Sequence, residues 1–255
     1  MQLPLSRAIS PGLEFLPRTG STNEVLVGRA SDAPHFAVVV TTDQTAGRGR
    51  LGRVWVAPPG KTLAVSVLLR PESPSLDSLG WLPLLAGLAM TRAVSSLVTG
   101  HAVTLKWPND VQVDGLKVSG LLTELAAGGT AVVVGAGLNL TMTEAELPTP
   151  VSTSLSLNGV PEESLVDAAL ASYLTELTHL YAGFAEAGFD ASRGLHGQVT
   201  AACGSLGKSV RVELPGGSDL FGIAESIDEF GRLVVRDDTT SHAVAAGDVT
   251  HLRYA

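Results

Sequence analysis

The segment from residue 103 to residue 140 constrains the fold more than any other part of the chain. It reads VTLKWPNDVQVDGLKVSGLLTELA, and AVVVGAGLNL follows shortly afterwards. Short apolar, β-branched runs between tight turns are typical of strands, and an Asp-Gly pair favours a two-residue hairpin. The segment therefore predicts strand, Pro-Asn turn, strand, Asp-Gly hairpin and strand, and then a further core strand at 131–140.

Similar patterns predict the elements around this segment. β-Branched runs predict strands at 36–42 and 62–70. A short helix is expected at 23–31 with Ser21 or Thr22 as its N-cap, and apolar spacings of three and four predict a helix within 75–99. The strongest helix pattern is at 161–187. The last helix is expected to have Pro161 in its first turn, with Glu162 and Glu163 at the positive end of its dipole.

The sequence pattern changes near residue 205, where short runs of alternating apolar and polar residues are separated by Pro-Gly-Gly, Glu-Phe-Gly and Asp-Asp turns. This pattern predicts a small β-barrel of about 50 residues. A chain of 255 residues suits one main domain with such an appendage. No low-complexity linker separates the two parts, so we expect them to pack directly together.

Charge and composition exclude several classes of function. With 45% hydrophobic and 16% charged residues, the chain is neither a disordered acidic protein nor a coiled coil. A net charge of −8 argues against broad nucleic-acid binding. Residues 41–120 nevertheless carry a net positive charge, which indicates a confined anion site or a solvated basic surface. The four lysines are 61, 106, 117 and 208.

The sequence carries no sign of export or membrane insertion. Its N-terminus lacks a basic start followed by an apolar core, and no apolar run approaches the ~18 residues of a membrane span. Cys203 is the single cysteine and cannot form an internal disulfide. We expect a cytoplasmic protein without a membrane partner.

Two phosphate-binding patterns lack their structural context. Residues 47–52 fit G-x-G-x-x-G, but that motif needs a helix directly after it, and RVWVAPPG follows. Gly207-Lys208-Ser209 also lacks a following helix, so Lys208 is expected on the barrel surface. The six histidines show no metal-ligand spacing with Cys203, and no G-x-S-x-G elbow is present.

Four polar or glycine-rich segments remain as candidates for chemistry. They are 21–23, 44–55, 106–110 and 117–120. Glycines let backbone N–H groups approach an anion, and arginines supply planar donors for phosphate, so 44–55 suits an anion-binding loop. The alternatives are a helix cap at Ser21 or Thr22, a basic surface turn, a structural turn at 107–110 and an exposed hairpin lysine at 117.

Taken together, GRGRLGRVW, KWPNDV, LKVSGLLTEL and VVVGAGLNL follow STN in this order. In this combination the chain closely resembles the biotin–protein ligases over about residues 15–255. The resemblance implies an α+β fold, with a mixed sheet and flanking helices similar to class II aminoacyl-tRNA synthetases and an SH3-like C-terminal barrel. It also implies a catalytic domain at 1–204 that binds biotin and ATP, and the barrel at 205–255.

The resemblance further implies a two-step ligase reaction with ATP and biotin as substrates and with Mg²⁺. Biotin and ATP give biotinyl-5′-AMP and pyrophosphate, and the biotinyl group then passes to a lysine. That lysine belongs to the biotin carboxyl carrier domain of acetyl-CoA or another acyl-CoA carboxylase.

Site residues follow from the same resemblance. Lys117 is expected as the central catalytic cation, and Arg48 as a catalytic residue on a loop that folds over the adenylate. Trp55 is expected to stack on adenine, and Asp110 is a candidate Mg²⁺ ligand. The expected biotin-binding residues are Ser21, Thr22, Asn23, Gln44, Gly47, Arg48, Gly49, Arg50, Lys117 and Gly120. The expected ATP-binding residues are Arg48, Arg50, Arg53, Trp55, Asn109, Lys117 and Asn139.

Rival hypotheses remain at this stage. A lipoate–protein ligase shares the fold and the adenylation chemistry, and a biotin-binding module would lack catalysis. An RNA-binding protein is disfavoured by the acidic net charge and by the absence of an aromatic platform. Because only twenty residues precede Ser21, we expect a monofunctional ligase without DNA-binding repressor activity.

Overall fold

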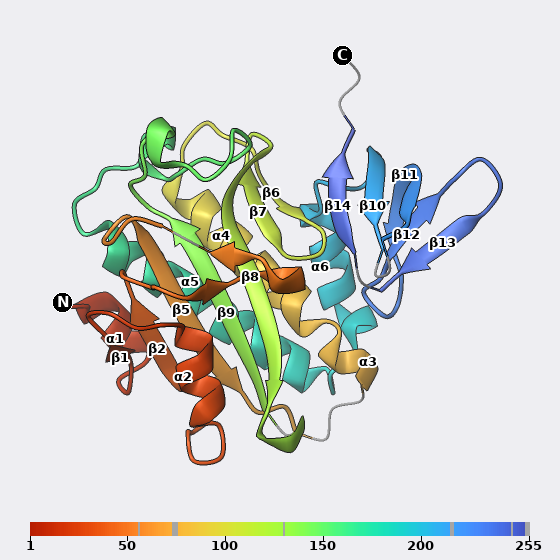
Figure 1. The fold of residues 1–255 in the computed structure, drawn as a ribbon. Coiled ribbons are helices and arrows are strands. Elements are labelled where there is room, and N and C mark those ends of the chain that lie inside the picture. Colours follow the sequence, from red (N-terminus) through yellow and green to blue (C-terminus); the bar gives the residue numbers. More distant parts are fainter. Residues whose placement is uncertain (56, 73–75, 130, 215–216, 246, 253–255) are drawn as a thin grey trace.

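A mixed sheet forms the centre of the protein. The computed structural model describes residues 1–55, 57–72, 76–129, 131–214, 217–245 and 247–252. Within these ranges seven strands pair in the order β1-β2-β5-β9-β8-β7-β6 (Figure 1). The strands are β1 (Glu14–Phe15), β2 (Val38–Thr41), β5 (Thr62–Leu69), β6 (Val103–Lys106), β7 (Asp110–Val113), β8 (Leu116–Ala126) and β9 (Ala131–Asn139). β1 pairs with β2 in parallel and the other neighbours pair antiparallel, so the predicted mixed sheet is confirmed.

The Asp-Gly hairpin is also confirmed. Asp114 and Gly115 connect β7 to β8 with φ values of 49° and 80°. Two consecutive positive φ values are what a tight two-residue hairpin turn requires, and Asp and Gly tolerate them better than most residues. Local sequence therefore determines the turn that carries the chain from β7 into β8.

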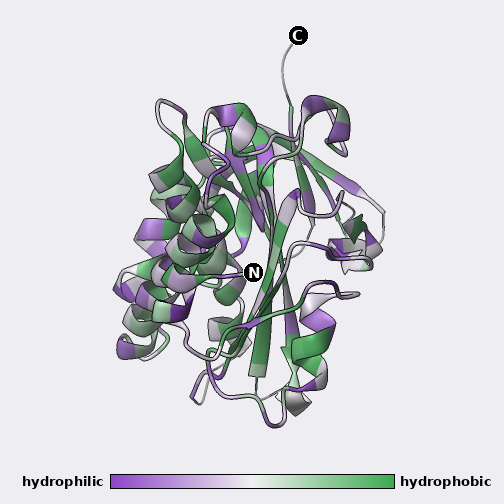
Figure 2. Cartoon of the chain, turned by 90° about the vertical axis from the view of Figure 1, so that its left-hand side faces the viewer, coloured by the Kyte–Doolittle hydropathy of each residue, from purple (hydrophilic) through white to green (hydrophobic). Residues whose placement is uncertain are grey.

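Helices cover both faces of this sheet. They are α1 (Pro4–Ile9), α2 (Thr22–Gly28), α3 (Leu76–Leu79), α4 (Leu82–Leu97), α5 (Leu165–Glu186) and α6 (Leu195–Ala202), with short 3₁₀ turns at Arg50–Gly52, Ala127–Gly129, Glu144–Glu146, Ser156–Asn158 and Ala191–Arg193. α4 and α5 pack together on one face in the main hydrophobic core, and most of the helices gather on that side in Figure 2. α2 packs on the opposite face through Leu26, with Val39, Leu68 and Val133 of the sheet.

The predicted start of the long helix is wrong. α5 begins at Leu165 rather than near Pro161. Ser164 has a φ of 58°, in the left-handed region, so it separates the preceding Pro-Glu-Glu turn from the first helical residue. Pro161, Glu162 and Glu163 therefore lie before the helix rather than in its first turn.

The C-terminal part is a separate antiparallel sheet. In the described part of the chain its five strands are ordered β13-β12-β11-β10-β14. They are β10 (Ser209–Glu213), β11 (Asp219–Ile227), β12 (Leu233–Arg236), β13 (Ser241–Val244) and β14 (Asp248–His251). The indole N–H groups of Trp81 and Trp107 donate to the carbonyls of Glu229 and Gly231, each at 3.0 Å. The two parts therefore pack directly together, as predicted.

Candidate active site

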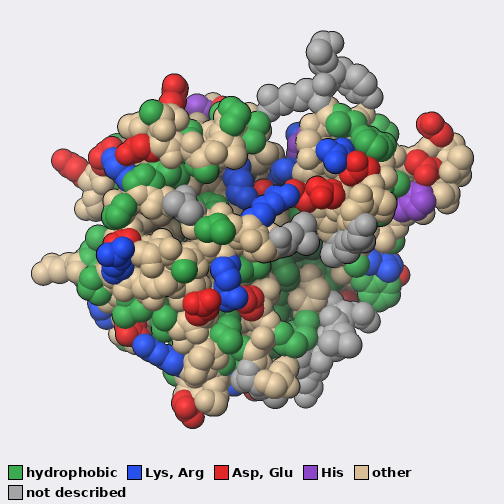
Figure 3. All heavy atoms as spheres, in the orientation of Figure 1, with side chains coloured by type: hydrophobic (Ala, Val, Ile, Leu, Met, Phe, Trp, Pro, Cys, Tyr) green, Lys and Arg blue, Asp and Glu red, His purple; other side chains and the backbone are tan. Residues whose placement is uncertain are grey.

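A cavity of about 400 Å³ opens on the face of the sheet that carries α2. This volume falls in the range typical of small-molecule sites. The cavity extends from the N-terminus of α2, across β8 and β9, to the start of β14. Figure 3 shows Lys and Arg side chains gathered where the large sheet meets the C-terminal strands.

Small residues at alternate strand positions make room for the cavity. Side chains alternate between the two faces of a strand, so positions two apart share a face. On β9, Val132 and Val134 belong to the main core, whereas Gly135 and Gly137 line the cavity. The run AVVVGAGLN thus packs one face of the sheet and leaves space on the other.

A β-bulge directs Lys117 into the cavity. In the pairing of β7 with β8, Val111 lies opposite Ser119 but Gln112 lies opposite Lys117, so Val118 is the extra residue. Strict alternation from Gly120, which lines the cavity, would place Val118 on the same side. Val118 is instead fully buried in the core, and Lys117 lines the cavity. Bulges commonly re-aim a side chain in this way next to a functional site.

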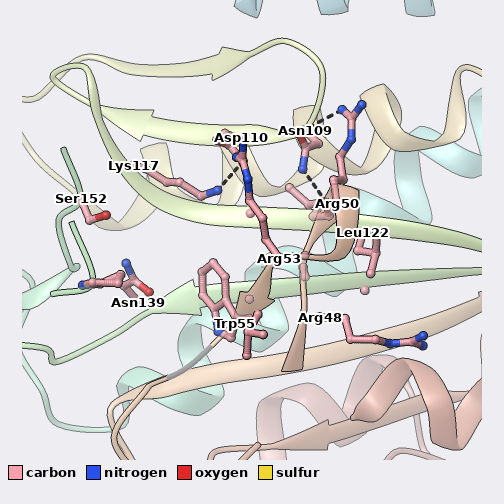
Figure 4. A pocket seen from close by; sticks show the side chains of 18 of the residues that line it. Arg48, Arg50, Arg53, Trp55, Asn109, Asp110, Lys117, Leu122, Asn139 and Ser152 are labelled. Atoms are coloured by element: carbon pink, nitrogen blue, oxygen red, sulfur yellow. Dashed lines mark hydrogen bonds and ion pairs between the residues drawn. The ribbon is translucent and has the colours of Figure 1, made fainter. Parts of the chain in front are cut away.

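Lys117 is paired with Asp110 at the middle of the cavity. Its ammonium Nζ lies 2.7 Å from Asp110 Oδ1 and 5.8 Å from the centre of the Trp55 ring (Figure 4). A Cβ on Gly120 would lie 3.0 Å from Lys117 Nζ. Glycine at this position therefore leaves room for the Lys117–Asp110 pair.

Beside α2, five residues form a connected group, here called the polar cluster: Thr22, Asn23, Gln44, Ser66 and Glu124. The Thr22 backbone N–H donates to Gln44 Oε1 at 2.9 Å, and Asn23 Nδ2 donates to Glu124 Oε2 at 2.7 Å. The hydroxyl of Ser66 is within hydrogen-bond distance of both Thr22 Oγ1 and Asn23 Oδ1. The amide and hydroxyl groups here suit an uncharged polar ligand.

Two predicted site residues have structural roles beside this cluster. Ser21 caps α2, because its hydroxyl accepts from the Glu24 backbone N–H at 3.4 Å, and it also lines the cavity. Gly47 is buried, and a Cβ there would lie 2.5 Å from Gln44 Nε2 and 2.6 Å from the Trp55 carbonyl oxygen. Its missing side chain makes room for protein atoms.

The segment 44–55 forms a small hairpin across the cavity. β3 (Gly47–Arg48) pairs antiparallel with β4 (Val54–Trp55), and the Arg50–Gly52 turn joins them. Its three arginines point in different directions (Figure 4). Arg48 pairs with Glu24 of α2 and Glu124 of β8, at 3.5 and 3.1 Å. The hairpin is thus attached to the rim of the polar cluster.

Arg50 and Arg53 connect the hairpin to the C-terminal sheet. Arg50 donates to Asn109 Oδ1 and to the Gly247 carbonyl, each at 3.3 Å, and Arg53 pairs with Asp248. Burial lowers the pKa of Arg50, whereas the hydrogen bond to Asp248 raises the pKa of Arg53. Both arginines border the cavity, as do Gly49 and Asn109.

Trp55 and Asn139 also border the cavity. Trp55 lies against the sheet, where a Cβ on Gly137 would be 2.7 Å from its ring. Asn139 Nδ2 donates to the Thr153 carbonyl at 2.9 Å. Trp55 Nε1 and Asn139 Oδ1 are buried and have no hydrogen-bond partner among the described residues. The flat ring of Trp55 suits a planar heterocycle.

Several residues of the site escaped sequence reasoning. Ser66 stands as a single serine within the apolar run AVSVLL, which was a usable signal. Glu124 lies within the motif LKVSGLLTEL but was given no role, although it joins the polar cluster. Ser152, Gly247 and Asp248 had no motif to mark them, and all three line the cavity.

The described residues contain no group of three or more His, Cys, Asp or Glu side chains that could hold a metal ion. The cavity carries two carboxylates, and Asp110 and Asp248 are each paired with a cation. In the same described ranges, no helix has the length and apolar character to cross a membrane.

The chain is similar to known proteins along most of its length. The Biotin/lipoate A/B protein ligase family model matches residues 15–140, and the biotin protein ligase C terminal domain model matches 205–252. The chain is 38% identical to biotin--[acetyl-CoA-carboxylase] ligase of Mycobacterium tuberculosis, over 94% of this chain and 89% of that one. It is 33% identical to the Paracoccus denitrificans enzyme of the same name, over 92% and 98%.

Solved structures give the same result. A biotin protein ligase from Aquifex aeolicus in complex with biotin and ATP superposes with a TM-score of 0.77 at 27% identity, covering 95% of this chain and 99% of that one. The family models and these relatives place the chain in the biotin/lipoate class of protein ligases. The chain belongs to the biotin protein ligase family.

Proposed function

We propose that the chain is an ATP-dependent biotin–protein ligase. It forms biotinyl-5′-AMP and pyrophosphate from biotin and ATP, and then biotinylates a lysine of a carboxylase carrier domain. One observation carries this proposal: Lys117 lines the same cavity as Thr22, Asn23 and Gln44 of the polar cluster and as Trp55 and Asn139, and an arginine-bearing hairpin borders that cavity. Residues 1–204 form the catalytic domain in this proposal, and residues 205–255 the C-terminal domain.

The polar cluster holds the ureido ring of biotin. Thr22, Asn23 and Gln44 border the cavity. Ser66 and Glu124 fix the orientation of Thr22 and Asn23, and Gln44 accepts from the Thr22 backbone N–H. Side chains held by such partners bind a ligand with little loss of conformational entropy. Ser21, Gly49, Gly120 and the buried Gly47 complete this side of the site.

The nucleotide binds on the other side of Lys117. Adenine stacks on Trp55, whose ring lies against β9, and Asn139 and Asn109 are beside it. Arg50 and Arg53 face the phosphates. Mg²⁺ is usually held by one or two carboxylates together with substrate phosphates, so Asp110 is the cavity residue that would hold it, and the ion would offset part of the phosphate charge.

Lys117 acts at the point where the two substrates meet. Biotin's carboxylate is already a nucleophile, so the first step needs no general base. The ammonium offsets the repulsion between that carboxylate and the α-phosphate, and then stabilises the charge of the transition state. The hairpin excludes water from the reactive anhydride until the carrier lysine arrives.

Pyrophosphate release measured with biotin and with lipoate tests this function. We expect release with biotin and ATP and only background release with lipoate. Release with lipoate alone would assign the chain to lipoate ligation. Biotin binding without pyrophosphate release would make it a binding module.

We expect the hairpin to become more protected when ligands bind. Within 44–55, Gly47 is the one buried position among the residues whose burial is described, so few apolar contacts hold the segment. Hydrogen exchange of these amides should slow on adding biotin and ATP, while that of β9 stays unchanged. Equal exchange with and without ligands would contradict a closing hairpin.

Arg48→Ala should release the intermediate. The substitution removes both ion pairs that attach the hairpin to α2 and β8, so the hairpin opens more often. Free biotinyl-5′-AMP should then leave the enzyme and label lysines of a bystander protein. Arg29→Ala, which removes an exposed ion pair with Glu14 outside the cavity, is the matched control. Bystander labelling equal to that of the control would refute the role of Arg48.

A further inference from the structure

Lys106 is a cavity residue to which the mechanism above gives no role. It is the last residue of β6, directly across the ladder from Asp110, and its half-buried side chain lines the cavity. No carboxylate of the described residues lies within ion-pair distance of its ammonium. The two carboxylates that line the cavity pair with other cations, Asp110 with Lys117 and Asp248 with Arg53.

A half-buried ammonium without a counter-ion is unfavourable. Removing a charge from water costs free energy that a direct partner normally offsets. Burial lowers the pKa of Lys106, and Lys117 and Arg53 lower it further, while Asp110 and Asp248 oppose the effect from a distance. The protein thus provides no direct counter-ion for Lys106, and a bound anion would supply one.

The position of Lys106 in the cavity indicates which anion it binds. In the proposed function, biotin occupies the polar cluster and adenine occupies the Trp55–Asn139 side. The remaining part of the cavity lies between β6 and the start of β14, where Arg50 contacts Gly247 and Arg53 contacts Asp248. This part is cationic, and the departing half of a triphosphate is the substrate portion still to be placed.

We propose that Lys106 binds the β- and γ-phosphates of ATP and the pyrophosphate that leaves. In that step a biotin carboxylate oxygen bonds to the α-phosphorus, and the bond from the α-phosphorus to the bridging oxygen breaks. The electron pair stays on the pyrophosphate, whose charge Lys106 stabilises. The inference rests on the proposed function and adds a residue dedicated to the first half-reaction.

Lys106→Met separates this role from the rest of the site. Losing one charge-assisted hydrogen bond weakens binding by about ten- to hundredfold. The KM for ATP and the inhibition constant of added inorganic pyrophosphate should therefore each rise by about that factor. Transfer from chemically prepared biotinyl-5′-AMP to the carrier should stay within about twofold, as should biotin affinity. Lys106→Arg should restore part of the effect on pyrophosphate.

Lys208→Met is the matched control, because Lys208 is exposed on the C-terminal part and outside the cavity. Unchanged pyrophosphate inhibition in Lys106→Met, or an equal loss in both half-reactions, would overturn the inference. If Lys106→Met has not folded, as loss of biotin binding would show, the same measurements are made on Lys106→Gln. The same two results would then overturn the inference. Failure of the unmodified enzyme to form the adenylate would instead refute the proposed function.

Discussion

Lys117→Ala is expected to retain the fold and to form biotinyl-5′-AMP about 10²–10³-fold more slowly, the loss typical when one preorganised charge-stabilising group is removed. The Lys117 ammonium lines the cavity that Thr22, Asn23 and Gln44 also line, and it lies 5.8 Å from the centre of the Trp55 ring. Without it, the biotin carboxylate and the α-phosphate repel each other with no cation between them. Single-turnover formation of the adenylate measures the effect.

Stability should change little in the same variant. The side chains of Lys117 and Asp110 are 33% and 16% exposed, and both line the cavity. Because water in the cavity can solvate Asp110 once the ammonium is removed, we expect a cost near the upper end of the range for solvent-accessible ion pairs, about 1 kcal/mol. The backbone pairing of the bulge does not depend on the ammonium. A denaturation midpoint close to that of the unmodified enzyme, with lost adenylate formation, is the expected combination. Near-normal adenylate formation would remove Lys117 from its central role.

Gly135→Ala should impair biotin binding, although it adds a single methyl group. The new Cβ would lie 2.1 Å from Asn23 Oδ1, a separation that real contacts do not allow. Asn23 must then leave its hydrogen bonds with Ser66 and Glu124. Because buried polar groups that lose a partner cost about 1–3 kcal/mol, biotin affinity should fall at least about tenfold.

Calorimetric titration with biotin measures this loss, and two further variants assign its cause. Gly183→Ala, where a Cβ meets nothing within 4 Å, should bind biotin normally. In an Asn23→Ala background, Gly135→Ala should cost much less, because the clashing side chain is gone. If the losses of biotin affinity from Gly135→Ala and Asn23→Ala are fully additive, the effect of Gly135→Ala does not depend on the Asn23 side chain.

The strands of this fold were predictable because their signals are local. Apolar alternation and the Asp114-Gly115 turn determine β7 and β8 without help from distant residues. The N-terminal helix α1 has no such signal. Its first N–H groups, those of Leu5 and Ser6, donate to the carboxylate of Asp167 on α5, a partner more than 160 residues away.

The candidate site was predictable to a similar extent. Of the predicted site residues, all but Gly47 line one cavity. The direction of Lys117 depends on a bulge, and Arg53 depends on Asp248 in the C-terminal sheet, so neither orientation follows from local sequence. The missing ion partner of Lys106 likewise emerges only when the two sheets are placed together.

Intact-mass analysis of a carrier domain tests the central claim most directly. The enzyme is incubated with biotin, ATP, Mg²⁺ and a biotin carboxyl carrier domain. A parallel reaction contains a carrier whose acceptor lysine is replaced by arginine. We predict that the first carrier gains the mass of one biotinyl group only when ATP is present, and that the second gains none. A carrier of unchanged mass, together with no biotinyl-5′-AMP in the reaction, would contradict the account.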